Sequence, residues 1–104
     1  MKKVMLVCAA GMSTSLLVTK MQKAAQKNGD EDLEIFARST NEATPLMQEG
    51  SINAVLIGPQ VKYMEKKFKE ILEEKNIPIE SINMMDYGMM NGEKILAQAK
   101  RMLG

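Results

Sequence analysis

Hydrophobic residues along the chain alternate between two patterns. Short continuous apolar runs, typical of strands buried on both faces of a sheet, are followed by segments in which apolar residues recur every three or four positions, as on one face of a helix. This alternation predicts four strands, each followed by a helix. The predicted strands cover residues 3–7, 33–37, 54–57 and 77–83, and the predicted helices cover residues 17–28, 44–50, 61–72 and 92–103.

Local signals indicate where several of these elements begin and end. Asn28-Gly29 is a typical helix end, and Thr44-Pro45 predicts an N-cap followed by proline at the first helical position. Pro78 lacks a backbone donor, so the fourth strand tolerates it only near its start or at a sheet edge. Residues 84–91 are predicted as a loop. The apolar stripe of the third helix consists of Val61, Met64, Phe68, Ile71 and Leu72.

The element order predicts an α/β fold: a single-domain three-layer sandwich in which a four-stranded parallel sheet carries helices on both faces. In such folds ligands bind beyond the carboxyl ends of the strands, where the strand order reverses. Three segments are therefore expected to meet there, namely Cys8 to Ser15, Gly58 to Gln60, and Met84 to Asn91.

The composition is that of an ordinary soluble globular protein and excludes several function classes. A length of 104 residues predicts one domain over residues 1–104, with 45% apolar and 26% charged residues. A net charge of +1 creates no basic field for nucleic acid, so nucleic-acid binding is not expected. The chain has no histidine and one cysteine, so we expect no metal site and no cofactor.

Neither a signal peptide nor a membrane span is predicted. The apolar run before the cysteine covers only residues 4–7, and a signal sequence needs about 7–15 such residues. No stretch approaches the roughly 18 apolar residues of a transmembrane helix. We therefore expect a cytoplasmic protein whose only link to a membrane is through a partner.

The most informative residue is Cys8, which stands where the first strand ends and a small, hydroxyl-rich segment leads into a helix. Unpaired backbone N–H groups and the positive end of a helix dipole favour anions and the thiolate form of cysteine. We interpret Cys8 as a nucleophile that is phosphorylated during turnover. The expected phosphate-binding residues are Ala9, Ala10, Gly11, Met12, Ser13, Thr14 and Ser15, through backbone N–H groups and hydroxyls.

An inert buried thiol and three other kinds of protein compete with this interpretation. A phosphatase or reductase of the low-molecular-weight type has an arginine six residues after its cysteine, where this chain has Thr14. A flavin- or phosphate-binding module of the flavodoxin kind has no need for a thiol at this place and needs more aromatic residues. A receiver domain needs an aspartate at the end of the third strand, where Ile57-Gly58 stands.

The segment around Cys8 resembles the phosphocysteine loop of enzyme IIB components of the sugar phosphotransferase system, in the lactose/chitobiose (cellobiose) family. Residues 56–61 and 87–92 are similar to later loops of the same family, and the resemblance covers nearly the whole chain. The Met12-Ser13 pair resembles the cellobiose, lichenan and chitobiose branch. The segment that carries the resemblance is Cys8-Ala9-Ala10-Gly11-Met12-Ser13-Thr14-Ser15-Leu16-Leu17.

This resemblance implies a fold like that of low-molecular-weight phosphotyrosine phosphatases and flavodoxins. It also implies that Cys8 accepts a phosphoryl group from a histidine of a IIA protein and passes it to a β-linked disaccharide or oligosaccharide held by a membrane IIC permease. The chain has neither the donor histidine nor membrane spans, so both partners are expected to be separate proteins.

Four residues are candidates for partner contacts. Met89 and Met90 lie in the predicted loop, where together with Met12 they would form an adaptable apolar rim; packing within the loop is the alternative. Tyr87 is expected either to contact the phosphate or a partner, or to be a half-buried core residue. Gln60 is a candidate for a hydrogen bond between loops. Asp86 is interpreted as a capping or turn residue rather than as a general acid.

Overall fold

The structure, a computed structural model, describes residues 2–8, 12–30 and 32–104, and of residues 12–14 it describes the backbone. Its strands are β1 (Lys2–Cys8), β2 (Leu33–Ser39), β3 (Ala54–Ile57) and β4 (Ile79–Ser81). Its helices are α1 (Met12–Lys27), α2 (Thr40–Glu49), the 3-10 helix η1 (Pro59–Met64), α3 (Glu65–Glu73), α4 (Met84–Gly88) and α5 (Gly92–Leu103).

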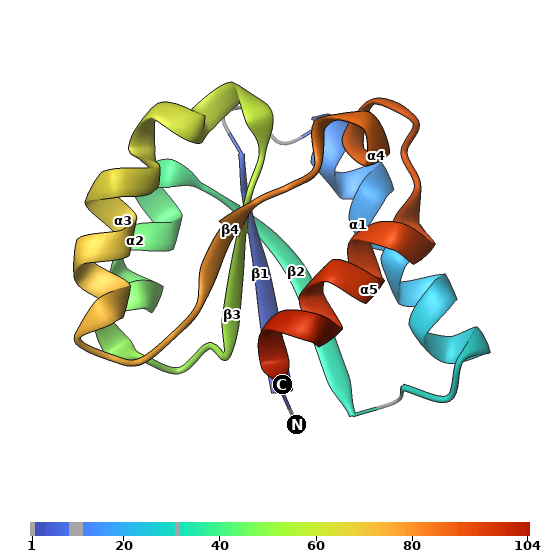
Figure 1. Ribbon diagram of the computed structural model, residues 1–104, viewed down its shortest axis with the longest axis horizontal. Coiled ribbons are helices and arrows are strands. Elements are labelled where there is room, and N and C mark those ends of the chain that lie inside the picture. The colour runs from blue at the N-terminus through green and yellow to red at the C-terminus, as the bar shows by residue number, and fades with distance from the viewer. Residues whose placement is uncertain (1, 9–11, 31) are drawn as a thin grey trace.

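The strands form one parallel sheet in the order β2-β1-β3-β4. Helices α2 and α3 cover one face, and α1 and α5 cover the other (Figure 1). The predicted fold class is therefore confirmed. The chain runs outward from β1 to β2 and then returns to place β3 on the other side of β1, so the strand order reverses between β1 and β3.

The apolar run of β1 is continuous because this central strand is buried on both faces. Val4 and Leu6 belong to a core cluster shared with α1 and α5. Met5 and Val7 belong to a second cluster that α2 and α3 close from the opposite side. Alternate residues of one strand therefore supply two separate cores.

Helix α2 begins earlier than Thr44-Pro45 indicated, and that prediction is wrong. Ser39 is the N-cap: its side chain accepts a hydrogen bond from the Glu42 N–H, and the Glu42 carboxylate accepts one from the Ser39 N–H, which together make a capping box. Pro45 consequently lies inside the helix. The predicted end is confirmed, because Gly50 closes the helix in a left-handed conformation with φ of 72°.

Three further segments differ from their predictions. The helix after Gly58 begins with the 3-10 turn η1, which is kinked at Val61 before α3 starts. The fourth strand is only Ile79–Ser81, at the edge of the sheet. Residues 84–91, predicted as a loop, contain the short helix α4.

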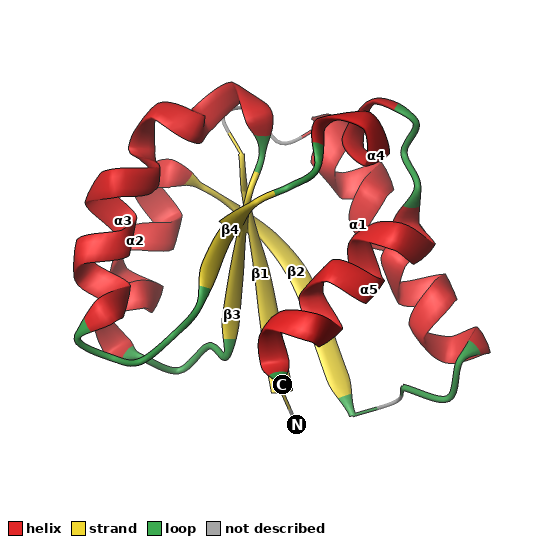
Figure 2. Cartoon of the chain, viewed as in Figure 1, coloured by secondary structure: helices red, strands yellow, loops and turns green. Residues whose placement is uncertain are grey.

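Two of the connections that leave the sheet at its carboxyl end lie at the same end of the molecule. The β3–η1 and β4–α4 connections both occur at the top of the view in Figure 2, where β1 also ends. In the part of the chain that the structure describes, no helix is long and apolar enough to span a bilayer.

Candidate functional site

Cys8 is the last residue of β1, at the carboxyl end of the central strand. It pairs in register with Ser39, the last residue of β2, and its side chain is 4% exposed. The thiol donates a weak hydrogen bond to the carbonyl oxygen of Arg38, with Sγ and O 4.0 Å apart. The only cysteine of the sequence thus stands at the edge of the sheet where ligands of α/β folds bind.

The turn after β3 packs against the end of β1. The Gly58 N–H donates to the Val7 carbonyl at 2.8 Å. A methyl group at Gly58 would lie 3.2 Å from that carbonyl oxygen, 3.3 Å from Gln60 Oε1 and 3.9 Å from Cys8 Cβ. Glycine permits this close approach, and the side-chain amide of Gln60 consequently lies near the end of β1. The expected meeting of these two segments is confirmed.

The segment after β4 starts from the same end of the sheet. The Ile82 N–H donates to the Ile57 carbonyl at 2.9 Å, so the chain leaves β4 beside the end of β3. Asn83 then caps α4 by accepting hydrogen bonds from the N–H groups of Met85 and Asp86. The expected capping role therefore belongs to Asn83, and Asp86 lies within the first turn of the helix.

Helix α1 begins at Met12, four positions after Cys8. The first four N–H groups of a helix have no partner inside the helix and point outward from its N-terminal end. The phosphate-binding predictions for Ala9, Ala10 and Gly11 lie outside the described residues, as do those for the side chains of Met12 to Thr14. Ser15 is exposed within α1, and its carbonyl accepts a hydrogen bond from the Thr19 hydroxyl at 3.1 Å.

The segments that adjoin Cys8 in sequence and at the turn after β3 carry no basic side chain. Residues 8–15 and 58–61 contain no lysine or arginine. Arg38 lies in β2 next to the residue that pairs with Cys8. Its guanidinium, however, donates to the Ala37 carbonyl at 2.7 Å and lies 4.8 Å from the centre of the Phe36 ring. The side chain therefore points back along β2. An anion bound beside Cys8 would depend on backbone N–H groups and hydroxyls.

A comparison with known families now agrees with this arrangement. A family model described as "PTS system, Lactose/Cellobiose specific IIB subunit" matches residues 3–98. The chain belongs to the lactose/cellobiose-specific IIB family of the sugar phosphotransferase system. As a IIB component it is a phosphotransferase of lactose/cellobiose-type sugar uptake.

Individual relatives of this IIB protein cover almost its full length. The galactose-specific EIIB component of Lactococcus lactis subsp. cremoris (strain MG1363) is 48% identical over 105 residues, which cover 98% of this chain and 96% of that protein. The cellobiose-specific EIIB component of Lactococcus lactis subsp. lactis (strain IL1403) has the same identity and coverage. The solution structure of the cellobiose-specific IIB component from Borrelia burgdorferi matches with a TM-score of 0.76 at 39% identity, covering 98% of this chain and 91% of that chain.

The four predicted partner contacts differ in exposure. Met89 is 69% exposed and Gln60 is exposed, whereas Tyr87 and Met90 are half-buried and pack against the core cluster of α1 and α5. The sequence interpretation also missed apolar residues at this end of the IIB protein. Those exposed side chains are Leu16, Tyr63, Met84 and Met85. The unusual run Met84-Met85 was the available signal.

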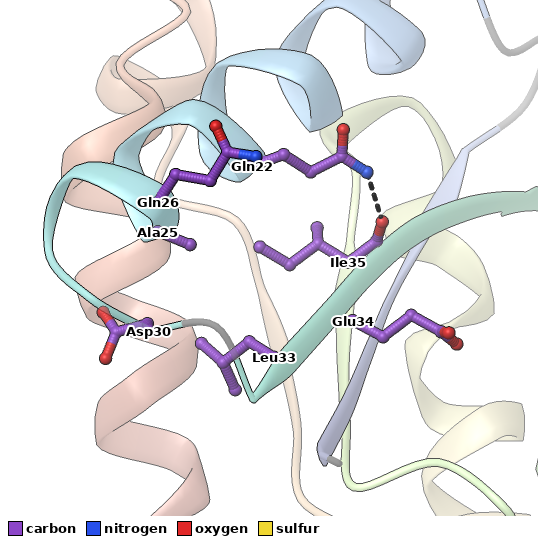
Figure 3. A pocket seen from close by; sticks show the side chains of 7 residues that line it. All are labelled: Gln22, Ala25, Gln26, Asp30, Leu33, Glu34 and Ile35. Atoms are coloured by element: carbon purple, nitrogen blue, oxygen red, sulfur yellow. Dashed lines mark hydrogen bonds between the residues drawn. The ribbon is translucent and has the colours of Figure 1, made fainter.

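A groove of about 560 Å³ between α1 and β2 lies away from this site. Figure 3 shows Gln22 directed to the edge strand, where its amide donates to the Ile35 carbonyl at 2.9 Å. Leu33, which also lines the groove, pairs with Lys2 at the opposite end of β1 from Cys8. The groove therefore lies near the amino end of the sheet and contributes nothing to the chemistry of the thiol.

Proposed function

We propose that Cys8 carries a phosphoryl group from a phosphohistidine of a IIA protein to a sugar held by a membrane IIC permease. The observation that carries the proposal is the place of Cys8 at the end of the central strand, beside the strand-order reversal and ahead of the first turn of α1. The IIA and IIC partners are inferred from the family, since this chain has neither a histidine nor a membrane-spanning helix among its described residues.

Two displacements at phosphorus make up the reaction. In the first, the Cys8 thiolate attacks the phosphoryl group, the S–P bond forms and the N–P bond to the donor histidine breaks. In the second, a sugar hydroxyl oxygen attacks phosphorus, releases its proton, and the S–P bond breaks to return the thiolate. A thiolate suits both steps because it is a strong nucleophile and a good leaving group.

Backbone groups account for the stability of the phosphorylated state in this proposal. A phosphoryl group carries about −1.5 to −2 charge near neutral pH. We propose as its donors the N–H groups at the start of α1 and the hydroxyls of residues 13–15, together with the helix dipole. Without an arginine clamp the transition state of hydrolysis loses its main charge partner, which favours a carrier over a phosphatase.

We propose a β-linked disaccharide or oligosaccharide of the cellobiose, lichenan or chitobiose type as the acceptor. The relatives named for galactose and for cellobiose are equally similar to this chain, at 48% identity, so sequence similarity does not separate these sugars. We expect the discrimination between these sugars to reside in the permease, which holds the sugar. Residues 1–104 are proposed to act as one cytoplasmic domain between the two partners.

The test is the intact mass of the wild-type protein and of Cys8→Ser after incubation with phosphoenolpyruvate, the general phosphotransferase proteins and a panel of IIA proteins. We expect a gain of one phosphoryl group on the wild type and none on Cys8→Ser. Circular dichroism of both proteins controls for folding. A folded wild type that gains no mass with any IIA protein, or a gain that persists in Cys8→Ser, would refute the role of Cys8.

A further inference from the structure

The parallel sheet has two edges, one at β4 and one at β2. The strand at the β4 edge is only three residues long and directly follows Pro78, and both features discourage the pairing of a further strand. The strand at the β2 edge is seven residues long and contains no proline. A long edge strand is a template for pairing with another chain, so the state of the β2 edge decides whether this sheet can be extended.

Alternate residues of β2 direct their backbone groups toward β1 and away from it. The Lys2 N–H donates to the Asp32 carbonyl at 2.8 Å, and the carbonyl of Arg38 accepts from the Cys8 thiol of β1. The even-numbered residues of this strand therefore face β1. The odd-numbered residues 33, 35, 37 and 39 direct their N–H and C=O groups to the open edge.

Hollows lie on both faces of β2. The groove of about 560 Å³ in Figure 3 lies between α1 and the amino half of the strand, and it is lined by Leu33 and Ile35 among others. On the other face, a groove of about 310 Å³ is lined by Glu34, Phe36 and Arg38, together with residues of α2 and of the segment that follows it. The edge of β2 is therefore open to an approaching strand.

Two side chains of the protein occupy successive carbonyls at the middle of this edge. The Gln22 amide of α1 donates to the Ile35 carbonyl at 2.9 Å (Figure 3). The Arg38 guanidinium donates to the Ala37 carbonyl at 2.7 Å, and its place 4.8 Å from the centre of the Phe36 ring holds it there. We call Gln22 and Arg38 the edge caps.

The two ends of the edge are occupied as well. The Leu33 N–H donates to the Asp30 carbonyl at 3.3 Å, and the Ser39 N–H donates to the Glu42 carboxylate at 3.3 Å. Water also satisfies carbonyl groups at an open edge, so hydrogen bonding alone does not require the edge caps. Their specific effect is on a competing strand, which has to displace them before it forms a ladder with β2.

The edge of β2 is complementary to the same edge of a second copy. Antiparallel pairing about Phe36 places Ile35 of one copy opposite Ala37 of the other, and the outward groups of both residues then face each other. In this register Glu34 lies opposite Arg38 of the second copy, and the two Phe36 side chains meet at the two-fold axis. Opposite charges and aromatic pairs across strands are stabilising, so the competing strand is β2 itself.

We propose that Gln22 and Arg38 keep this chain monomeric by closing the β2 edge to a second copy of itself. The inference goes beyond the proposed function, because it concerns association and requires no phosphoryl transfer. It has a consequence for the site, since Ser39 at the end of the edge pairs with Cys8. Strand addition at β2 would place a second molecule one strand away from the thiol.

The test is sedimentation velocity at rising protein concentration, with a reductant present so that Cys8 forms no disulfide between molecules. We expect wild type to stay at 11.6 kDa and the double variant Gln22→Ala, Arg38→Lys to reach twice that mass. These changes remove the amide and the guanidinium fork but keep the positive charge. The matched control, Gln26→Ala with Arg101→Lys, changes the same residue types away from the β2 carbonyls and should remain monomeric.

Two further variants make the result decisive. Gln22→Ala with Arg38→Thr removes the guanidinium bond completely and should also dimerise. Adding Ala37→Pro to either double variant should restore the monomer, because proline removes an N–H that a second β2 needs and is tolerated where that N–H faces the open edge.

Any other result overturns the proposal. Circular dichroism establishes that each variant is folded. Wild type that dimerises, folded double variants that both remain monomeric, or a control that dimerises equally would show that the edge caps do not set the association state. A dimer that persists with Ala37→Pro, or growth into larger aggregates, would show that the association does not use the two-fold pairing of β2.

Discussion

Gly92 lies at a close approach between helices α5 and α1. A side-chain carbon at Gly92 would lie 2.8 Å from the backbone carbon of Lys20 and 2.8 Å from its Cβ, well inside van der Waals contact. The first residue of α5 therefore packs directly against the backbone of α1. This contact helps hold the layer of helices that covers one face of the sheet.

We predict that Gly92→Ala lowers the free energy of unfolding by about 1–3 kcal/mol, the usual cost of forcing an extra methyl group into a packed contact. The matched control is Gly88→Ala, where a methyl group would meet nothing within 4 Å. That control should be neutral or up to about 1 kcal/mol more stable, because alanine is the better helix former. Urea unfolding followed by circular dichroism measures both. Equal midpoints for the two variants would contradict the steric argument.

At the residue scale, the sequence was most informative where chemistry is local. Cys8 was predicted as a candidate nucleophile from a strand end, a small-residue segment and a helix start, all within ten positions. The role of Gly92 was invisible, because its neighbour Lys20 is distant in sequence. The sequence likewise did not determine whether Met84 and Tyr87 are exposed or buried, because a short helix has too few turns to show a periodic pattern.

At the element scale, Ser39 connects the sheet to helix α2. It ends β2 beside Cys8 and, without an intervening loop, becomes the N-cap of α2. The Thr44-Pro45 pair and the Ser39-x-x-Glu42 pattern are both helix-start signals in the sequence. The capping box prevails because it satisfies N–H groups at the point where the chain leaves β2. Pro45 then forgoes one hydrogen bond inside the helix.

We predict that Ser39→Ala destabilises the protein by about 1 kcal/mol, the typical loss for removing an N-cap side chain. Ser39→Thr is the conservative control and should stay within about 0.5 kcal/mol of wild type, because threonine also forms capping boxes. The readout is the urea midpoint at constant m-value. A Ser39→Ala protein as stable as wild type would show that the capping box contributes nothing to α2.

At the scale of the whole molecule, the sheet separates two cores. Ile57 of β3 belongs to the cluster under α2 and α3, and Ile95 of α5 belongs to the cluster under α1 and α5. Both residues are fully buried. Because they lie in different clusters, each side chain can change without a shared cavity forming.

We predict that Ile57→Val and Ile95→Val each cost about 0.5–1.5 kcal/mol of unfolding free energy. Their effects should add within about 0.5 kcal/mol in the double variant, because the two sites share no core cluster. The unfolding should remain a single cooperative transition, since both clusters include residues of β1. A coupling energy above about 1 kcal/mol, or two separate transitions, would show that the division into two cores is wrong.

The sequence by itself determined the order of strands and helices, the parallel sheet and the candidate nucleophile. These follow from apolar periodicity, from the handedness of strand–helix–strand connections and from the few residues around Cys8, all of which act over short stretches of chain. The family resemblance read from residues 8–17 is confirmed by the family match over residues 3–98.

The tertiary structure alone decided the strand order and the existence of α4 with its exposed methionines. Each depends on contacts between residues far apart in sequence: Gly58 with Val7, Ile82 with Ile57, and Tyr87 with the core of α1 and α5. An apolar side chain favours burial, but the sequence does not say which apolar side chains the fold buries. Only the packed structure determines which methionines are buried and which remain exposed.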